Sequence, residues 1–338
     1  MARMLLTRRA GLAVAAGALL RGGRIARAAT PLRLSHTDTP VGARQQAAAF
    51  FAKRFAELTQ NRFEVQIFPA GQLANDTQSL EQLRMAGIDF AVTGISTYAD
   101  HVRTLNLTEL PYLVGTYQQG WKLFDESAWI RAQFDKLAGH GIRVLATWEA
   151  GFRSFTTTLP QRTPADAKGH KMRIFSNQML RWIIEAFGYT AVAMPVTEVY
   201  LGIEQGAVIG QENPIDTIYS QKFYEVAPYI TLTRHSYNPL PVSVANSTWE
   251  RFSADDRQSL IQAAQEAAAF SRQLVVAGDA SELAAMEQKG AKVFRPDLAP
   301  WAAAAQPVYG KAQKVYGNDV DAILADAAKV RSALPGDG

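Results

Sequence analysis

The 338-residue chain contains no cysteine. Disulfide bonds, thiolate metal sites and cysteine nucleophiles are therefore excluded, whereas an oxidising compartment is neither required nor contradicted. The five histidines form no His-x-His or His-Glu-x-x-His pair that would hold a metal. A Gly-x-Ser-x-Gly elbow, a phosphate-binding glycine-rich loop and a dinucleotide fingerprint are also missing. These absences argue against an enzyme, a cofactor and a metal site.

Long apolar segments are missing as well. The run Ala10 to Leu20 holds 11 residues, whereas a helix that spans a bilayer needs roughly 20. It follows a basic stretch and precedes Ala26-Arg27-Ala28, a small-x-small cleavage pattern. We therefore expect residues 1–28 to be an export signal peptide and the mature protein to be periplasmic. Thr7-Arg8-Arg9 also resembles a twin-arginine export signal, although Gly11 replaces the bulky apolar residue typical there.

A strong net charge is missing once this leader is set aside. The leader holds six arginines and no acid, which leaves 29 basic and 31 acidic residues and a formal net charge of −2. The isoelectric point near 9.2 thus belongs to the leader, and no basic stripe suggests a nucleic-acid partner. An apolar fraction of 48% with 20% charged residues is typical of a soluble globular protein.

Apolar periodicity predicts an α/β protein with two similar halves. In the first half the spacing predicts the order strand, helix, strand, helix, strand, over residues 32–36, 43–59, 63–68, 76–86 and 88–92. A helix over 121–137 and a strand over 142–148 follow. The second half repeats the strand–helix alternation between residues 171 and 213, which is the unit of an open α/β domain.

The chain is predicted to pass between the halves twice, at 149–152 and again at 240–245. Ser253 then begins a helix with Asp256 in an approximate capping box, long enough to brace both halves up to about Gln288. The Ala-rich segment 301–333 also reads as helical. The predicted domains are 29–150 with 246–338, and 151–245. Two crossings without a long linker predict a two-lobed clamp with a ligand cleft between hinged lobes.

The second half places polar side chains where ligands bind in such domains, at the ends of strands. Arg173 lies in one predicted strand, and Gln211-Glu212-Asn213 ends another. A guanidinium fork matches a carboxylate bidentately, and an asparagine amide donates to the same group while staying neutral. Either arginine alone reads as a surface or salt-bridged residue, but with Arg153, which lies 20 residues before Arg173, the set is a candidate site for an organic acid.

Several motifs in fixed order also identify a family. The segments GFRSFTT, PADAKGHKMR, AMPVTEVYLGIEQGAVIGQENP and KFYEVAPYITLTRH resemble the extracytoplasmic solute-binding proteins of TRAP (tripartite ATP-independent periplasmic) transporters, of the dicarboxylate-binding type. The resemblance runs from about residue 31 to the C-terminus and is densest between Gly151 and His235. It implies the two-lobed fold, with connecting strands across the cleft and a long bracing helix. It also implies two integral membrane subunits as partners.

The resemblance assigns roles to three of these residues. Arg173 and Asn213 match the residues that hold the ligand carboxylate, and Arg153 matches a second arginine. The best expectation for the ligand is a C4-dicarboxylate. Ile209 and Ala150 depart from the family pattern beside the site, so a monocarboxylate, a keto acid or a sugar acid stays open. A periplasmic sensory protein that binds the ligand for a receptor is a second alternative, and no catalytic residue is expected.

Further candidate ligand contacts follow from their places at predicted strand and helix ends. From the crossings and the second half these are Trp148, Glu149, Phe175, Asn177, Gln211 and Tyr237, with Asn238 beside it. From the first half they are Asp38, Gln72, Asn75 and Ser96. Glu198 and Glu212 read as structural partners of other residues. Each of these is a weaker prediction than the two arginines.

Overall fold

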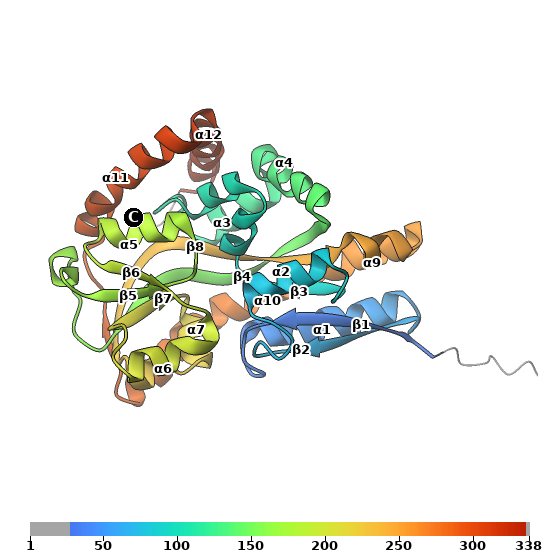
Figure 1. The fold of residues 1–338 in the computed structure, drawn as a ribbon, viewed down its shortest axis with the longest axis horizontal. Helices are drawn as coiled ribbons and strands as arrows, with labels where there is room; N and C mark the ends of the chain where they lie inside the picture. The colour runs from blue at the N-terminus through green and yellow to red at the C-terminus, as the bar shows by residue number, and fades with distance from the viewer. Residues whose placement is uncertain (1–27, 336–338) are drawn as a thin grey trace, which may run out of the picture.

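Residues 28–335 are described in a computed structural model (Figure 1). The predicted signal peptide, except for its last residue, lies outside them. Within this part of the chain no helix is both long and apolar enough to cross a membrane.

One mixed nine-stranded sheet runs through the molecule in the order β2-β1-β3-β8-β4-β7-β5-β6, with β9 beside β8. Three parallel strands form one end, β1 (Thr30–His36), β2 (Phe63–Phe68) and β3 (Phe90–Val92). Three others form the opposite end, β5 (Lys171–Ile174), β6 (Thr190–Ala193) and β7 (Gly210–Asn213). The middle contains β4 (Ile142–Thr157) and β8 (Tyr229–Ala245), which are antiparallel, and β9 (Lys292–Phe294). This arrangement confirms the predicted α/β class.

Helices cover both ends of the sheet. We call β1–β3 with α1 (Ala43–Leu58) and α2 (Asp76–Arg84) the first lobe. The second lobe comprises β5–β7 with α5 (Gln178–Ala186), α6 (Val199–Glu204), α7 (Ile215–Ser220) and α8 (Phe223–Val226). The remaining helices are α3 (Tyr117–Glu126), α4 (Ala128–Lys136), α9 (Asn246–Arg251), α10 (Ala254–Gln288), α11 (Ala299–Tyr316) and α12 (Asn318–Ala333).

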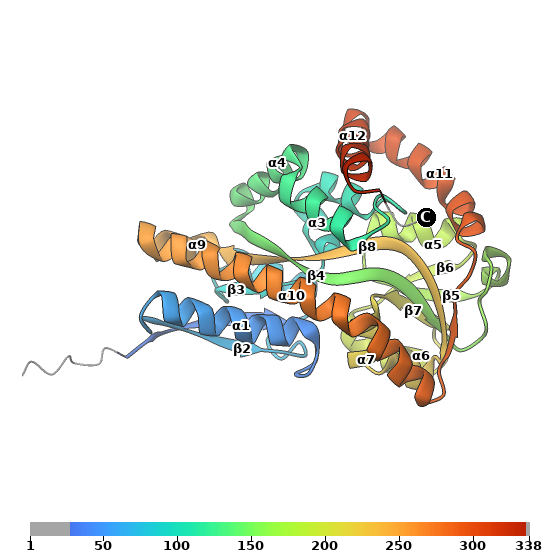
Figure 2. The same cartoon turned by 180° about the vertical axis from the view of Figure 1, so that it is seen from behind.

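Two long strands and one long helix join the lobes. β4 and β8 have 16 and 17 residues, so the separate strands predicted on either side of each crossing are continuous. Their pairing shifts register between Glu149 and Phe152, where Gly151 has φ +109°; this positive φ favours glycine. Helix α10, with its capping box at Ser253, crosses in front of β4 and β8 in the view of Figure 2 and runs from α9 toward α6. The exact domain limits stay a prediction.

Two predicted helices are each divided in two. The segment 121–137 breaks at Ser127, whose hydroxyl accepts from the N–H of Ile130 at 3.1 Å and so caps α4. The segment 301–333 breaks at Gly317, where φ is +54°. Helix α11 packs against α5 of the second lobe through Trp301, which is fully buried. The Trp301 ring lies 5.1 Å from Phe187 and 5.5 Å from Phe155, between ring centroids.

Replacing Trp301 by alanine should therefore remove a large part of the packing that holds α11 to the second lobe. We expect Trp301→Ala to lower the free energy of unfolding by about 3–5 kcal/mol, as for other buried aromatic side chains. Urea denaturation measures this change. Leu201→Ala, at a side chain that is 55% exposed, is the control and should change stability by less than about 0.5 kcal/mol. Equal small effects of both variants would contradict the packing described.

Candidate ligand-binding site

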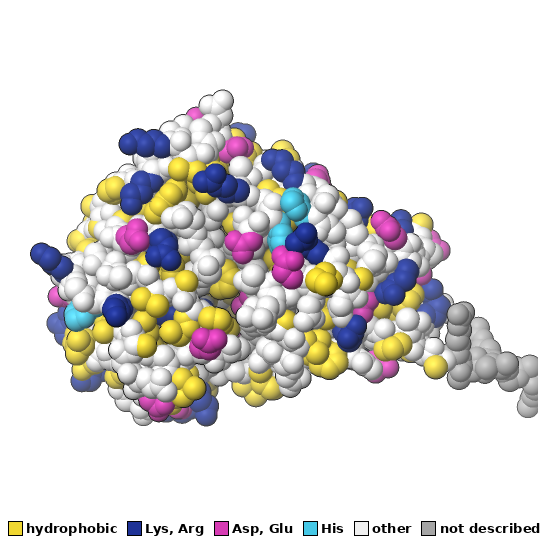
Figure 3. All heavy atoms as spheres, in the orientation of Figure 1, with side chains coloured by type: hydrophobic (Ala, Val, Ile, Leu, Met, Phe, Trp, Pro, Cys, Tyr) yellow, Lys and Arg dark blue, Asp and Glu magenta, His cyan; other side chains and the backbone are white. Residues whose placement is uncertain are grey.

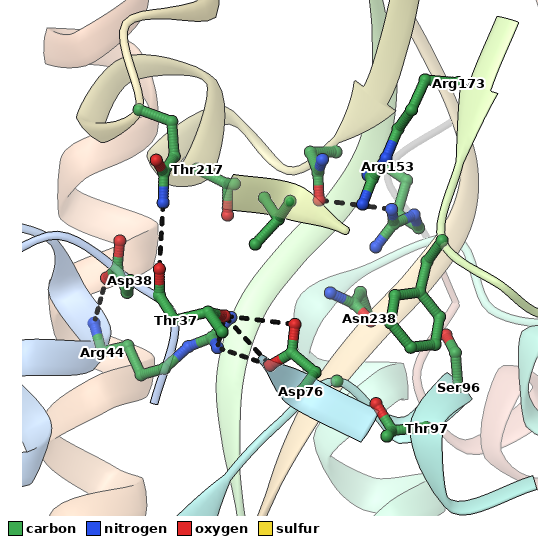
Figure 4. Close-up of a pocket in the computed structure, with 15 residues that line it drawn as sticks. Thr37, Asp38, Arg44, Asp76, Ser96, Thr97, Arg153, Arg173, Thr217 and Asn238 are labelled. Atoms are coloured by element: carbon green, nitrogen blue, oxygen red, sulfur yellow. Dashed lines mark hydrogen bonds and ion pairs between the residues drawn. The ribbon is translucent and has the colours of Figure 1, made fainter. Parts of the chain in front are cut away.

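A polar cavity of about 40 Å³ lies between the two lobes. A second cavity of about 140 Å³ adjoins it and shares Asp76, Phe175 and Val196 with it. Figure 4 shows Arg153 and Arg173 on one side of the first cavity and Asp76 and Thr97 on the other. The cavity is thus lined by charged groups from both lobes.

Arg173 is a buried cation without a carboxylate partner. Its side chain projects from β5 and the residue is 1% exposed. Nε donates to the carbonyl oxygen of Met194 at 2.8 Å, and no carboxylate of residues 28–335 lies within 4.0 Å of its guanidinium. Burial lowers the pKa of Arg173 to about 10, so the group is still charged at neutral pH. Glu212 and Asp76 favour the charged form from a greater distance, but a buried charge without a close partner is costly, and an anion in the cavity would remove that cost.

Arg153, in contrast, is neutralised by the protein. It projects from β4 toward Glu212 on β7. The two strands are paired neighbours in the sheet, so the two residues lie close together. Nη2 of Arg153 donates to Glu212 Oε1 and to the Glu212 carbonyl, both at 2.8 Å, and Nε donates to Oε2. Burial by itself would raise the pKa of Glu212, but Arg153 and His235 outweigh burial and lower that pKa to about 2. Arg153 therefore lines the cavity as half of an ion pair.

The first lobe contributes a second pair, Arg44 and Asp76. Asp76 is the first residue of α2 and accepts from the Thr37 hydroxyl at 3.0 Å. Nη1 of Arg44, in the first turn of α1, lies 3.8 Å from Asp76 Oδ1. Burial raises the pKa of Asp76, and Arg44 opposes that effect. The negative charge of Asp76 is thus matched within its own lobe.

Neutral polar groups complete the cavity. Asn238, on β8, is 3% exposed and lines the cavity. Its Oδ1 is buried and has no hydrogen-bond partner among residues 28–335. A buried acceptor of this kind lowers the stability of the protein unless a donor forms a hydrogen bond with it. The site therefore suits a ligand that brings one negative charge and hydrogen-bond donors.

The family model of bacterial extracellular solute-binding protein, family 7 (DctP), matches residues 34–315. The chain belongs to this family. The match confirms the resemblance to TRAP solute-binding proteins, a family that includes dicarboxylate-binding members.

Individual relatives in the family bind different acids. The 2,3-diketo-L-gulonate-binding periplasmic protein YiaO of Escherichia coli is 31% identical over 268 residues, which cover 79% of this chain and 81% of that protein. The sugar acid binding protein of Advenella mimigardefordensis, solved with galactonate, has a TM-score of 0.86 at 26% identity and covers 89% of this chain and 99% of its own. A TRAP protein of Sulfurospirillum deleyianum with bound succinate has a TM-score of 0.83 at 29% identity, with 90% and 99% covered. These named proteins are binding proteins.

The structure brings seven of the predicted contact residues into the cavity. These are Arg153, Arg173, Asn213, Phe175, Asp38, Ser96 and Asn238. Asn75 caps α2 by accepting from the N–H of Gln78 at 2.9 Å, and it lines the adjoining cavity. The predicted residues thus converge from both lobes.

Six other predicted residues line neither cavity. Trp148 is buried under α10 and donates to the carbonyl of Ala264 at 3.1 Å. Glu149 and Tyr237 contact each other, because the Tyr237 hydroxyl donates to the Glu149 carboxylate at 2.7 Å. The others are Asn177, which caps α5; Gln211, which donates to Thr156; and Gln72, which is exposed. Their polar groups are satisfied by the protein itself or by solvent.

Several cavity residues did not stand out in the sequence. Arg44 and Asp76 lie in the first turns of helices, where charged residues are common as caps or as solvated groups. Thr37, Thr97 and Gln221 carry no motif. They line the cavity because of how the two lobes pack together, and no local sequence pattern predicts that packing. Among residues 28–335, no group of three or more acidic or histidine side chains could hold a metal ion.

The ion pair of Arg153 with Glu212 should make stability depend on pH. The pKa of Glu212 falls from 4.5 unfolded to about 2 folded, so its contribution is present above pH 4.5 and is lost as the pH falls toward 2. We expect Glu212→Gln to lower the free energy of unfolding by about 3–5 kcal/mol at pH 7, because it leaves Arg153 buried and unpaired.

Urea denaturation at pH 7, 4.5 and 3 measures both effects of the Glu212 substitution. The loss of stability between pH 4.5 and pH 3 should be smaller in Glu212→Gln than in the wild type. Glu204→Gln, at an exposed acid on α6, should follow the wild type at every pH. An unchanged stability in Glu212→Gln at pH 7 would contradict the buried ion pair.

Proposed function

We propose that this chain is the exported solute-binding subunit of a TRAP transporter, and that it captures an organic acid by pairing the carboxylate with Arg173. The observation that carries the proposal is the buried, charged guanidinium of Arg173 with no acid within 4.0 Å among the described residues. A ligand carboxylate would supply that acid in a site from which water is excluded. The captured acid would then be delivered to integral membrane subunits, as the family membership suggests.

The charges of the cavity favour one carboxylate over two. Arg153 is paired with Glu212, and Arg44 lies beside Asp76, so Arg173 is the cavity arginine left without an acid among the described residues. A C4-dicarboxylate, our first expectation, would place a second negative charge in a cavity that already holds Asp38 and Asp76. Like charges brought together in this way are unfavourable by several kcal/mol.

Hydrogen-bonding groups favour a hydroxylated acid. Asp76, which accepts from the Thr37 hydroxyl, can accept further hydrogen bonds when ionised, and the buried Oδ1 of Asn238 has no donor among residues 28–335. Sugar hydroxyls can donate to both groups, whereas a simple aliphatic acid brings no donor for Asn238. We therefore propose a sugar acid or a similar hydroxylated monocarboxylate as the ligand, with a C4-dicarboxylate as the alternative.

Surface charge gives no support to a polyanionic partner. On the face shown in Figure 3, basic and acidic side chains are interspersed. This distribution fits a protein that recognises a small anion in an internal cavity, and the proposal includes no nucleic-acid partner. A sensory role would use the same cavity, and the absence of neighbouring genes for membrane subunits would favour that reading.

A thermal-shift screen of the mature chain, residues 29–338, tests the proposal. The acids are galactonate, gluconate, glucuronate, pyruvate, succinate, malate and benzoate. A ligand at 100 times its dissociation constant stabilises the native state by about 2.7 kcal/mol, and we expect a sugar acid to give this shift. Arg173→Ala should abolish the shift, and Arg173→Lys should weaken it because the bidentate fork is lost. Arg181→Ala, on the exposed face of α5, should respond as the wild type does.

Asp76→Asn should change selectivity without removing the carboxylate anchor. Because the substitution removes a negative charge opposite Arg173, we expect the affinity for succinate relative to galactonate to rise at least about tenfold, or about 1.4 kcal/mol. Isothermal titration with both acids measures the ratio. An unchanged ratio would contradict the role of Asp76. If the wild type binds succinate more strongly than galactonate, the ligand is a dicarboxylate and not a sugar acid.

A further inference from the structure

The start of α1 is capped from the other lobe. Its N-cap residue, Gly42, has no side chain to accept from the first N–H groups. The N–H of Ala43 instead donates to Oδ1 of Asp216 at 3.0 Å, and Asp216 lies on α7 of the second lobe, 173 positions away. The next N–H, that of Arg44, donates to Asp38 at 3.2 Å. A helix start normally finds this acceptor in its own N-cap side chain.

Crowding disfavours a capping side chain at Gly42. A Cβ atom built there would lie 2.0–2.5 Å from the carboxylate atoms of Asp38. Serine, threonine, aspartate or asparagine would therefore displace the Asp38 carboxylate from its contacts with Arg44 and Ser220. The carboxylate of Asp216 takes over the role of the cap, and it can do so only while the lobes are together.

Other hydrogen bonds between the lobes surround this contact. Ser220 donates to Asp38 at 3.0 Å, and Gln221 donates to the Thr37 carbonyl at 3.1 Å. Asp216 is 7% exposed, so its carboxylate is held away from solvent in this arrangement. The first lobe and α7 thus meet through polar contacts that opening of the cleft would separate.

Asp216 lies near enough to three other acids to feel their charges. Asp38 and Asp216 are joined by Asp279 and Glu282 of α10, whose Oδ1 and Oε2 are buried without partners among the described residues. The groups of opposite charge that face them are Arg44, from α1, and Arg234, from β8. Tyr117, from α3, donates to Asp279.

When all of these groups are ionised, the acids outnumber the two arginines and the cluster carries a net negative charge. Burial, with the nearby Asp38, raises the pKa of Asp216 to about 7. Burial, with Asp216, raises the pKa of Glu282 to about 8. Protons would therefore bind to this cluster within the range of pH that a periplasmic protein meets.

We propose that Asp216 is a positioning residue that latches the two lobes by capping α1, and that proton binding at this contact favours the closed cleft. The inference rests on the proposed function, because a ligand clamp must open and close. Closing brings the charge of Asp216 against Asp38 and α10, and a proton on the cluster relieves that repulsion. Opening returns Asp216 to solvent, where its affinity for protons falls toward the ordinary value for aspartate.

The sign of the pH effect follows from this difference. The closed form binds protons more tightly than the open form, so the ratio of closed to open molecules rises as the pH falls. For one group with a pKa near 7 in the closed form, the ratio should rise about tenfold between pH 8 and pH 6. Well above pH 8 the ratio should be constant.

Spin labels can measure the ratio without a ligand. The chain has no cysteine, so Met85→Cys in the first lobe and Leu201→Cys in the second would be labelled selectively. Both positions are exposed, at 80% and 55%. Pulsed electron paramagnetic resonance of the mature chain at pH 8 and pH 6 gives the populations at the short and long distances. We expect the ratio of the short-distance population to the long-distance population to be about tenfold higher at pH 6 than at pH 8.

Two variants separate the charge of Asp216 from its capping role. Asp216→Asn keeps an acceptor for Ala43 without the charge, so closure at pH 8 should increase and the change between pH 8 and pH 6 should fall below about threefold. Asp216→Ala removes the cap and should reduce closure at both pH values. Asp256→Asn, at the start of α10, is the control and should keep the wild-type pH response.

The proposal is overturned if the wild type shows the same populations at pH 8 and pH 6, or if Asp216→Asn keeps the tenfold change. A merely structural role would make Asp216→Asn and Asp216→Ala alike, with the pH response preserved, and that outcome also overturns it. Because no acid is added, failure of the organic-acid screen would leave this result standing. Success of the screen likewise does not depend on the latch.

Discussion

The rest of the site depends on one buried arginine that forms no ion pair with an acid among the described residues. Arg173 is 1% exposed, remains charged, and has one backbone carbonyl as its hydrogen-bond partner among the described residues. In a folded protein such a charge is unfavourable unless an anion reaches it. Binding of a carboxylate therefore removes an unfavourable free energy that the folded protein already carries. A neutral amide or ester does not remove it, so the site selects for an anion.

The fold makes this arrangement possible by keeping the other charges in pairs. β4 and β7 lie side by side, so Arg153 meets Glu212 before any ligand arrives. In the first lobe, the starts of α1 and α2 bring Arg44 toward Asp76. β4 and β8 run through both lobes as single strands and keep the lobes in one shared sheet. Between the lobes, Arg173, the two ion pairs and the Asn238 oxygen surround one small cavity.

Much of this architecture could be predicted from the sequence, because apolar periodicity and caps are local. The strand 63–68, the helix from Ala43 and the capping box at Ser253 are confirmed at or near the predicted positions. Arg173, Arg153 and Asn213, which the motifs singled out, line one cavity, and their contact with a ligand carboxylate stays a prediction. The breaks at Ser127 and Gly317 were missed because helical periodicity continues across them. Arg44, Asp76 and the trans-lobe cap at Asp216 depend on contacts between distant segments, and no spacing in the chain encodes them.

A crystal structure of the mature chain with a bound sugar acid tests the account most directly. The account predicts a ligand carboxylate facing Arg173, with both guanidinium Nη atoms within about 3 Å of its oxygens, and ligand hydroxyls directed toward Asp76 and Asn238. The ion pair between Arg153 and Glu212 should persist in the complex. A ligand whose carboxylate binds elsewhere, or a cavity in which Arg173 contacts no anion, would contradict it.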